Sequence, residues 1–269
     1  MAEAIISLAH IKKSYGKHEV LRDVNLTVNK GDIYGLIGKN GSGKTTIFKI
    51  ILGLSDSNAG EVHIGGAKDN LETGRSKIGF FIGQNFFPYM TPRQNLEYYR
   101  RLKRVRDKSE VERVLKLVEL DNTGRKKVSG FSMGMKQRLG IANALLGNPE
   151  VIILDEPTNG LDPQGIADIR KLIKKLNAEL GITVIVSSHI LGELQSTANR
   201  FGILHNGEIV KVLTEEDLKV SANYVRLNVD DVSRAVEVLA ANGIQVLGES
   251  KDTISLEDYY FDVVGGSKE

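Results

Sequence analysis

The stretch Gly38-Lys39-Asn40-Gly41-Ser42-Gly43-Lys44-Thr45 decides the fold class. It fits the pattern G-x-x-x-x-G-K-[S/T], a loop whose backbone N–H groups surround the phosphates of a nucleotide. An apolar run at 33–37, short enough to be a buried strand, precedes it, and helix-spaced apolar residues at 44–52 follow it. Together these elements aim N–H groups and the positive end of a helix dipole at one point. A chance glycine-rich turn would lack both flanking elements, so we predict that the loop binds a nucleoside triphosphate.

Individual residues of this loop have distinct expected tasks. The ammonium group of Lys44 should reach the outer phosphates, and the hydroxyl of Thr45 should bind Mg²⁺. The other predicted nucleotide-binding residues of the loop are Gly38, Lys39, Asn40, Gly41, Ser42, Gly43 and Thr46.

Two carboxylates, Asp155 and Glu156, follow a second apolar strand candidate at 151–154. Ligands collect at the carboxyl ends of strands in parallel sheets. We expect Asp155 to support Mg²⁺, directly or through a water molecule, and Glu156 to orient or deprotonate the attacking water. Buried strands also often end in solvated acidic turns, but the combination with a phosphate loop favours the catalytic interpretation.

The composition indicates a globular chain. It has 269 residues, of which 41% are hydrophobic and 26% charged. The formal net charge of +2 does not favour nucleic acid or an anionic membrane surface as a partner. The absence of cysteine excludes disulfides and thiolate metal sites and agrees with a cytosolic protein. No signal peptide is recognised, and no apolar run approaches the ~18–20 residues that span a bilayer.

Apolar runs of strand length alternate with helical patterns along the chain. A helical stretch runs from about residue 90 to 147, and within it Ser109 and Glu112 are predicted to form a capping box. Later, Asp162 is the predicted N-cap of a helix that Gly181 ends. Such alternation predicts an α/β fold with a mostly parallel sheet and helices on both faces. Strand candidates lie at 5–28 (a pair around a turn), 33–37, 61–66, 78–82, 151–154 and 182–187.

A polar stretch that begins at Glu215 suggests a boundary near residues 215–222. We therefore predict a nucleotide-binding domain at 1–220, with a helical subdomain at about 90–147, and a small α+β appendage at 221–269. Within the appendage, the pattern predicts a strand, a helix and two further strands at 224–229, 233–241, 244–247 and 253–256.

The segment Ser129-Gly130-Phe131-Ser132-Met133-Gly134-Met135-Lys136-Gln137-Arg138-Leu139 indicates a known family. With the phosphate loop, Asp155-Glu156 and His189 in this order, the chain resembles the ATPase subunit of an ABC transporter over about residues 1–215. Residues 133–138 and 156–163 are similar to those of bacterial bacitracin and lantibiotic exporters and immunity transporters. The resemblance implies a P-loop NTPase of ABC type, with an N-terminal antiparallel β-subdomain and a helical subdomain.

The resemblance implies further roles at the nucleotide. Tyr15 matches the aromatic residue that stacks on adenine, although an exposed tyrosine in a turn is also an ordinary surface residue. Gln84 matches the glutamine that meets Mg²⁺ and couples to the membrane subunit. His189 matches the histidine that contacts the γ-phosphate. The expected catalytic residues are Glu156 and His189, and the expected Mg²⁺ residues are Thr45, Gln84 and Asp155.

A second set of residues is implied to act on ATP bound to the opposite subunit. Ser132 and Gly134 match the two signature residues that touch its γ-phosphate, while Met133 and Met135 stand where the common signature has glycine and glutamine. A hydroxyl and a glycine at the start of a helix suit phosphate binding. Asp162 matches the loop that links the two sites of a dimer, a role compatible with that of helix N-cap.

The leading functional hypothesis is an ATP- and Mg²⁺-dependent subunit that forms an ATP-dependent homodimer and energises a separate transmembrane permease. The resemblance places it at the cytoplasmic face of a bacterial membrane, in contact with the membrane only through the permease. The exported substrate is expected to be a peptide antibiotic, a lantibiotic or a similar amphipathic molecule. The apolar run Phe86–Met90 is expected to meet the permease, although part of it can pack within the helical subdomain.

Two other hypotheses fit the residues less well. A soluble non-transport ABC-type ATPase that acts on ribosomes or DNA is disfavoured by the single phosphate loop, its short distance to the signature and the near-neutral charge. A degenerate cassette is disfavoured because Lys44, Asp155, Glu156 and His189 are present. The run Asn29–Asp32 fits the guanine-selecting N-K-x-D pattern of GTPases, but it precedes the phosphate loop, so we interpret it as a turn.

Overall fold

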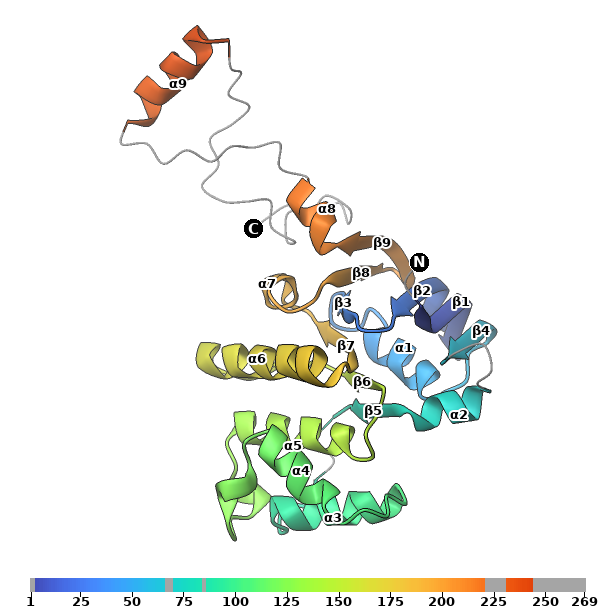
Figure 1. The fold of residues 1–269 in the computed structure, drawn as a ribbon. Coiled ribbons are helices and arrows are strands. Elements are labelled where there is room, and N and C mark those ends of the chain that lie inside the picture. The colour runs from blue at the N-terminus through green and yellow to red at the C-terminus, as the bar shows by residue number, and fades with distance from the viewer. Residues whose placement is uncertain (1–2, 66–69, 84–85, 221–230, 244–269) are drawn as a thin grey trace.

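The computed structural model describes residues 3–65, 70–83, 86–220 and 231–243. Within them, one sheet of nine strands runs in the order β4-β1-β2-β9-β8-β3-β7-β6-β5 (Figure 1). The strands are β1 (Ala4–Tyr15), β2 (His18–Asn29), β3 (Ile33–Ile37), β4 (Ala59–Ile64), β5 (Ile78–Phe81), β6 (Val151–Leu154), β7 (Thr183–Ser188), β8 (Arg200–His205) and β9 (Glu208–Thr214).

The sheet combines an antiparallel part with a parallel part, as predicted. Strand β1 pairs antiparallel with β2 and with β4. Strand β3 pairs parallel with β7 and β8, and β6 pairs parallel with β5 and β7. The parallel register places the carboxyl ends of β3, β6 and β7 at one edge of the sheet, because Leu154 pairs with Val186 and Ile37 with Ser188.

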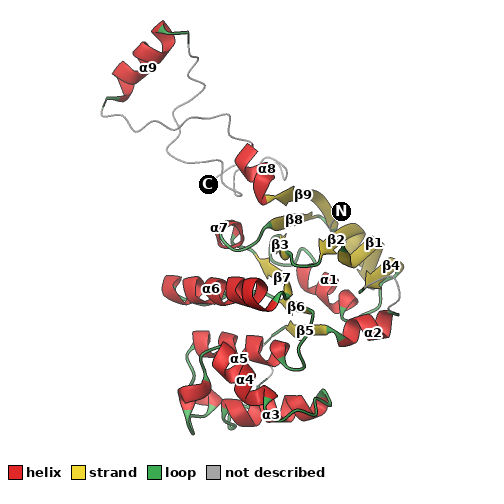
Figure 2. Cartoon of the chain, viewed as in Figure 1, coloured by secondary structure: helices red, strands yellow, loops and turns green. Residues whose placement is uncertain are grey.

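Helices cover both faces of the parallel strands (Figure 2). Side chains alternate along each strand: Ile33 and Ile37 of β3 join the core that contains α5 and α6, while Tyr34 and Leu36 join the core that contains α1. The helices are α1 (Lys44–Ile51), α2 (Leu71–Ser76), α3 (Pro92–Leu102), α4 (Glu110–Leu117), α5 (Met133–Leu145), α6 (Pro163–Leu180), α7 (Leu191–Gln195), α8 (Glu215–Val220) and α9 (Val232–Ala241).

Helix α1 is fixed by its apolar side. Ile47, Phe48, Ile50 and Ile51 are all buried in the core beneath the antiparallel strands. Complete burial of such a side chain contributes about 1.5–3 kcal/mol. The burial of four of them holds the start of α1, and with it the end of the phosphate loop, against the sheet.

The helical stretch contains α3, α4 and α5, which Figure 1 shows grouped beside β5. Helix α3 begins with a capping box: Thr91 Oγ1 accepts from the Gln94 N–H at 3.2 Å, and Gln94 Oε1 accepts from the Thr91 N–H at 2.9 Å. The capping box predicted at Ser109 and Glu112 is wrong. Ser109 has helical backbone angles, and its hydroxyl donates to the Asp107 carboxylate at 2.7 Å instead.

The hairpin of β8 and β9 was not predicted. Its two-residue turn is Asn206-Gly207, both with positive φ, between the paired residues His205 and Glu208. The polar stretch that begins at Glu215 is the first turn of helix α8.

The helix predicted at 233–241 is present as α9, and none of its residues is buried. The strands predicted at 224–229, 244–247 and 253–256 lie outside the described residues. The division into 1–220 and 221–269 therefore stays a prediction. Among the described helices, none combines the length and the apolar character that a bilayer crossing requires.

Candidate active site

The phosphate loop connects the end of β3 to the first turn of α1, and close contacts require glycine at two of its positions, Gly38 and Gly43. A Cβ on Gly38 would lie 2.5 Å from Ser42 Oγ and 2.9 Å from the Leu204 carbonyl oxygen. Gly43 is the N-cap of α1 with φ 107°, and a Cβ there would lie 2.7 Å from a methyl group of Leu21. Because Gly43 has no side chain to cap the helix, first-turn N–H groups remain available to an anion.

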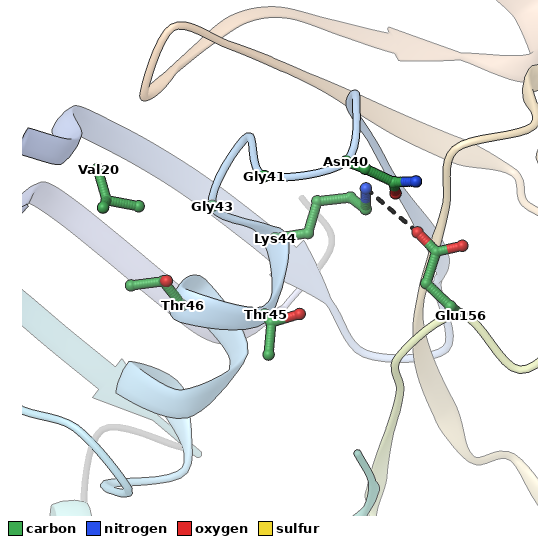
Figure 3. A pocket seen from close by; sticks show the side chains of 8 residues that line it. All are labelled: Val20, Asn40, Gly41, Gly43, Lys44, Thr45, Thr46 and Glu156. Atoms are coloured by element: carbon green, nitrogen blue, oxygen red, sulfur yellow. Dashed lines mark ion pairs between the residues drawn. The ribbon is translucent and has the colours of Figure 1, made fainter. Parts of the chain in front are cut away.

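A cavity of about 300 Å³ adjoins this loop (Figure 3). Figure 3 shows the Lys44 side chain, from the start of α1, and the Glu156 side chain, from the segment after β6, pointing toward each other. The fold thus brings the predicted phosphate-binding loop and the predicted catalytic carboxylate to one cavity. Its lining residues are Val20, Asn40, Gly41, Gly43, Lys44, Thr45, Thr46 and Glu156.

Lys44 is held by oxygen atoms on several sides. Its Nζ donates to the carbonyl oxygens of Gly38 at 2.7 Å and Lys39 at 3.3 Å, and it lies 3.2 Å from Glu156 Oε1. The side chains of Lys44 and Glu156 are only 6% and 20% exposed, so this ion pair is poorly screened by solvent. Oε1 makes no hydrogen bond with good geometry in the described part of the chain, so the contact is mainly electrostatic. A phosphate oxygen near Lys44 would compete directly with Glu156 for this cation.

Asp155 is positioned by two hydroxyl groups. Thr45 Oγ1 donates to Asp155 Oδ2 at 2.6 Å, and Ser187 Oγ donates to Asp155 Oδ1 at 2.7 Å. Ser187 also accepts from the Glu156 N–H at 2.9 Å, so it fixes both acidic residues. Sequence reasoning missed Ser187; the available signal was a hydroxyl at the carboxyl end of an otherwise apolar strand.

The oxygen atoms of Thr45 and Asp155 fit the hard-oxygen chemistry of Mg²⁺. Mg²⁺ commonly binds through one or two carboxylates together with substrate phosphates rather than in an all-protein cage. No cluster of three or more His, Cys, Asp or Glu side chains suited to a metal exists in the described ranges. The third predicted Mg²⁺ residue, Gln84, lies outside the described residues.

The Glu156 carboxylate contacts two basic side chains, Lys44 and His189. The φ of 51° at Glu156 is unusual for a residue with a side chain and is of the kind that costs roughly 1–3 kcal/mol. His189, just after β7, has its Nδ1 2.6 Å from Glu156 Oε2, while Lys44 faces the other carboxylate oxygen. The unusual backbone angle is therefore associated with a carboxylate placed between two basic side chains.

Tyr15 lies at the end of β1 and is 49% exposed. The Ser55 hydroxyl above all, and then the Thr46 hydroxyl, lower the pKa of Tyr15. Thr46 also lines the cavity, and Lys13 Nζ lies 5.0 Å from the centroid of the Tyr15 ring. The position suits adenine stacking, which stays a prediction.

The signature residues lie apart from this cavity, since none of residues 132–135 lines it. Ser132 is the N-cap of α5 and accepts from the Met135 N–H at 3.3 Å. A Cβ on Gly134 would have its nearest neighbour, a Leu161 methyl group, at 3.9 Å, so this turn is open. Asp162 is the N-cap of α6, as predicted, and accepts from the Gly165 N–H at 3.0 Å.

The aromatic run after position 84 divides between core and surface. Phe86 packs against the core that contains α5 and α6, whereas Tyr89 is 62% exposed. The fully buried Asn95 holds this run: it accepts from the Phe87 N–H at 2.9 Å and donates to the Phe87 carbonyl at 3.1 Å. Phe87 in turn makes an edge contact with Tyr98 at 4.9 Å between centroids. Sequence reasoning missed Asn95, because its role depends on tertiary contacts.

Comparison of the sequence with known proteins identifies a family and individual relatives of this chain. The family model described as "ABC transporter" matches residues 21–159. The bacitracin transport ATP-binding protein BcrA of Enterococcus faecalis is 36% identical over 300 aligned positions, which cover 98% of this chain and 97% of the relative. The lantibiotic transport ATP-binding protein SrtF of Streptococcus pyogenes is 40% identical over 211 residues, covering 77% of this chain and 89% of the relative.

Solved structures give the same result for the fold. The dimeric ATP-binding cassette MJ0796, in a post-hydrolysis state bound to ADP and Pi, superposes with a TM-score of 0.69 at 32% identity. That similarity covers 78% of this chain and 99% of the cassette. A nucleotide-free ATP-binding cassette from an ABC transporter superposes with a TM-score of 0.70 at 26% identity and covers 82% of this chain and 96% of that one.

Proposed function

Because this chain belongs to the ABC transporter family and is one of its ATP-hydrolysing subunits, we propose that it energises a separate transmembrane permease. The observation that carries the proposal is the convergence of Lys44, Asp155, Glu156 and His189 around the phosphate loop of a chain similar over its length to a bacitracin transport ATP-binding protein.

We propose the following roles at the site. Lys44 turns from Glu156 to the outer phosphates of ATP, and its charge then offsets theirs. The freed carboxylate of Glu156 accepts the proton of the attacking water, and His189 orients that carboxylate and contacts the γ-phosphate. Thr45 and Asp155, with Gln84, would hold Mg²⁺, which neutralises charge that develops on the phosphates.

A second copy of the chain is proposed to complete each site. Ser132 and Gly134 form an open helix start that does not line the cavity of their own subunit. A head-to-tail pair would place this helix start against the γ-phosphate bound by the partner, with Asp162 near the joint between the two sites. The dimeric state of the cassette MJ0796 supports this arrangement.

We propose a peptide antibiotic, a lantibiotic or a similar amphipathic molecule as the exported substrate, because the relatives are named for bacitracin and lantibiotic transport. The subunit would act at the cytoplasmic face of a bacterial membrane and reach it only through the permease. The exposed aromatic residue Tyr89, together with Phe87 and Tyr98, would contribute to that contact. The net charge of +2 gives no support to nucleic acid as a partner.

Affinity purification from detergent-solubilised membranes of the native cell tests the partner. We expect a multi-span protein to co-purify with the tagged chain, and expect Tyr89→Ala combined with Tyr98→Ala to weaken its recovery. Cells that carry Lys44→Ala in place of the native chain should lose resistance to bacitracin or to the relevant lantibiotic. Recovery with ribosomes or DNA, and no membrane protein, would contradict the transport role.

A further inference from the structure

The Glu193 carboxylate contacts both segments that carry the catalytic side chains. It lies on the short helix α7, and its Oε2 accepts a hydrogen bond of 2.6 Å from the Thr158 hydroxyl. The same oxygen lies 3.3 Å from the Ser188 hydroxyl. Thr158 follows Glu156 by two residues, and Ser188 directly precedes His189. One oxygen atom therefore joins the segment after β6 to the last residue of β7.

These contacts lie in the interior. Thr158 is 8% exposed and Ser188 is 2% exposed, so their hydroxyl groups depend on protein partners. Ser188 Oγ also accepts from the Ile190 N–H at 2.9 Å, so the Glu193–Ser188 contact reaches the backbone on both sides of His189. In the described part of the chain no basic side chain forms an ion pair with Glu193, and hydroxyl groups are the side-chain partners of its carboxylate.

Helix α7 is itself fixed to the strand that leads into the phosphate loop. Leu194 and Ala198 are buried over Gly35 of β3, at 3.4 and 3.2 Å from the position of a Cβ on that glycine. The Thr197 hydroxyl donates to the Glu193 carbonyl at 2.7 Å and holds the backbone that bears the carboxylate. Residues 193–198 thus connect three parts of the site: Leu194 and Ala198 contact the strand before the phosphate loop, and Glu193 contacts the turn after Glu156 and the residue before His189.

We propose that Glu193 is a positioning residue for ATP hydrolysis. Through its contacts with Thr158 and Ser188, it keeps Glu156 Oε2 and His189 Nδ1 2.6 Å apart. In this proposal Glu193 does not itself contact the nucleotide. The proposal rests on the catalytic roles proposed above for Glu156 and His189. Loss of the carboxylate would leave the buried Thr158 hydroxyl without its acceptor and the Ser188 hydroxyl with only the Ile190 carbonyl at 3.3 Å, and it would allow the two segments to shift. A misplacement of about 1 Å in a catalytic group can lower the rate by about 10²-fold.

Steady-state kinetics of four variants test this role. We expect Glu193→Ala to lower kcat by roughly 10- to 100-fold with little change in the KM for ATP. Glu193→Gln should keep most of the kcat that Glu193→Ala loses, since the amide oxygen of glutamine can still accept hydrogen bonds from both hydroxyl groups. Thr158→Val should reproduce much of the decrease in kcat caused by Glu193→Ala. The double variant Glu193→Ala with Thr158→Val should have a kcat no lower than that of Glu193→Ala alone. The control is Glu179→Ala, an exposed glutamate on α6, which should keep the native rate.

The proposal is contradicted if Glu193→Ala keeps the native kcat. It is also contradicted if Glu193→Ala and Thr158→Val lose activity only in proportion to the loss of folded protein, as measured by thermal unfolding and equilibrium ATP binding. Glu156→Gln serves as the reference: if it hydrolyses ATP at the native rate, the proposed catalytic role of Glu156 fails first. A slow Glu156→Gln beside a fully active Glu193→Ala overturns only the positioning role.

Discussion

Replacing Glu156 by glutamine separates the chemistry of the site from its nucleotide binding. The change keeps the side chain's size and its reach to His189, but it removes the carboxylate's basicity. A positioned general base is worth about 10²–10⁴-fold in rate, which corresponds to about 2.7–5.4 kcal/mol in the activation free energy. We therefore expect single-turnover ATP hydrolysis to slow by that factor.

The same substitution acts on Lys44 through the ion pair. At 3.2 Å and an effective dielectric constant of about 20, the attraction between the two charges is about 5 kcal/mol before desolvation costs are counted. Glutamine removes this attraction, so Lys44 is released to a phosphate at lower cost. Equilibrium ATP binding should be at least as tight as in the native chain.

The matched control is Glu150→Gln, which removes a carboxylate outside the cavity, paired with Lys77 at 3.4 Å. It should change neither hydrolysis nor binding. Native single-turnover hydrolysis by Glu156→Gln would refute the role of Glu156 as base. Loss of ATP binding together with hydrolysis would refute the separation of chemistry from binding and show that the carboxylate mainly supports the phosphate loop.

Three further substitutions test other parts of the account. Gly79→Ala should destabilise the fold by about 1–3 kcal/mol or more in thermal unfolding, because its Cβ would lie 1.9 Å from the Ala144 carbonyl oxygen, and a normal unfolding midpoint would contradict this. A hydrogen bond from Arg100, above all other causes, lowers the pKa of Glu97 to about 2. The stability that the ionised Glu97 contributes to the fold is therefore present above pH 4.5 and is lost as the pH falls toward 2. Glu97→Gln should therefore flatten the decline of stability with acid in that range, and an unchanged pH profile would argue against it. Thr45→Val should raise the Mg²⁺ concentration needed for half-maximal hydrolysis while ATP binding without Mg²⁺ stays close to native, and an unaltered Mg²⁺ titration would remove Thr45 from the proposed metal site.

The parts of the fold that follow from local pattern were predictable from the sequence. The phosphate loop is one example, since its glycines, Lys44 and Thr45 stand together between a strand and a helix. The N-cap Asp162 and the terminal Gly181 of α6 are others, because a cap depends on a few neighbouring residues. The turn Asn206-Gly207 is an equally local hairpin signal, although the hairpin of β8 and β9 was not predicted.

The rest depends on contacts between distant segments. Helix α7 has only five residues and is held by Leu194, whose burial over β3 no local pattern reveals. Ser109 has the right residue type for a cap, but the carboxylate of Asp107 takes its hydroxyl. At the site, the motif residues could be named from the sequence, whereas Ser187 and Glu193 could not, because their partners lie on other strands and loops.

The direct test of the two-copy site is light scattering of purified Glu156→Gln at high protein concentration. Without nucleotide we expect a monomer, because the start of α5 at Ser132 has no γ-phosphate to contact. With ATP the molar mass should double, and Lys44→Ala in the same background should prevent the change because it removes the main cation at the phosphates. A mass that does not respond to ATP, in protein that binds ATP normally, would contradict the composite site.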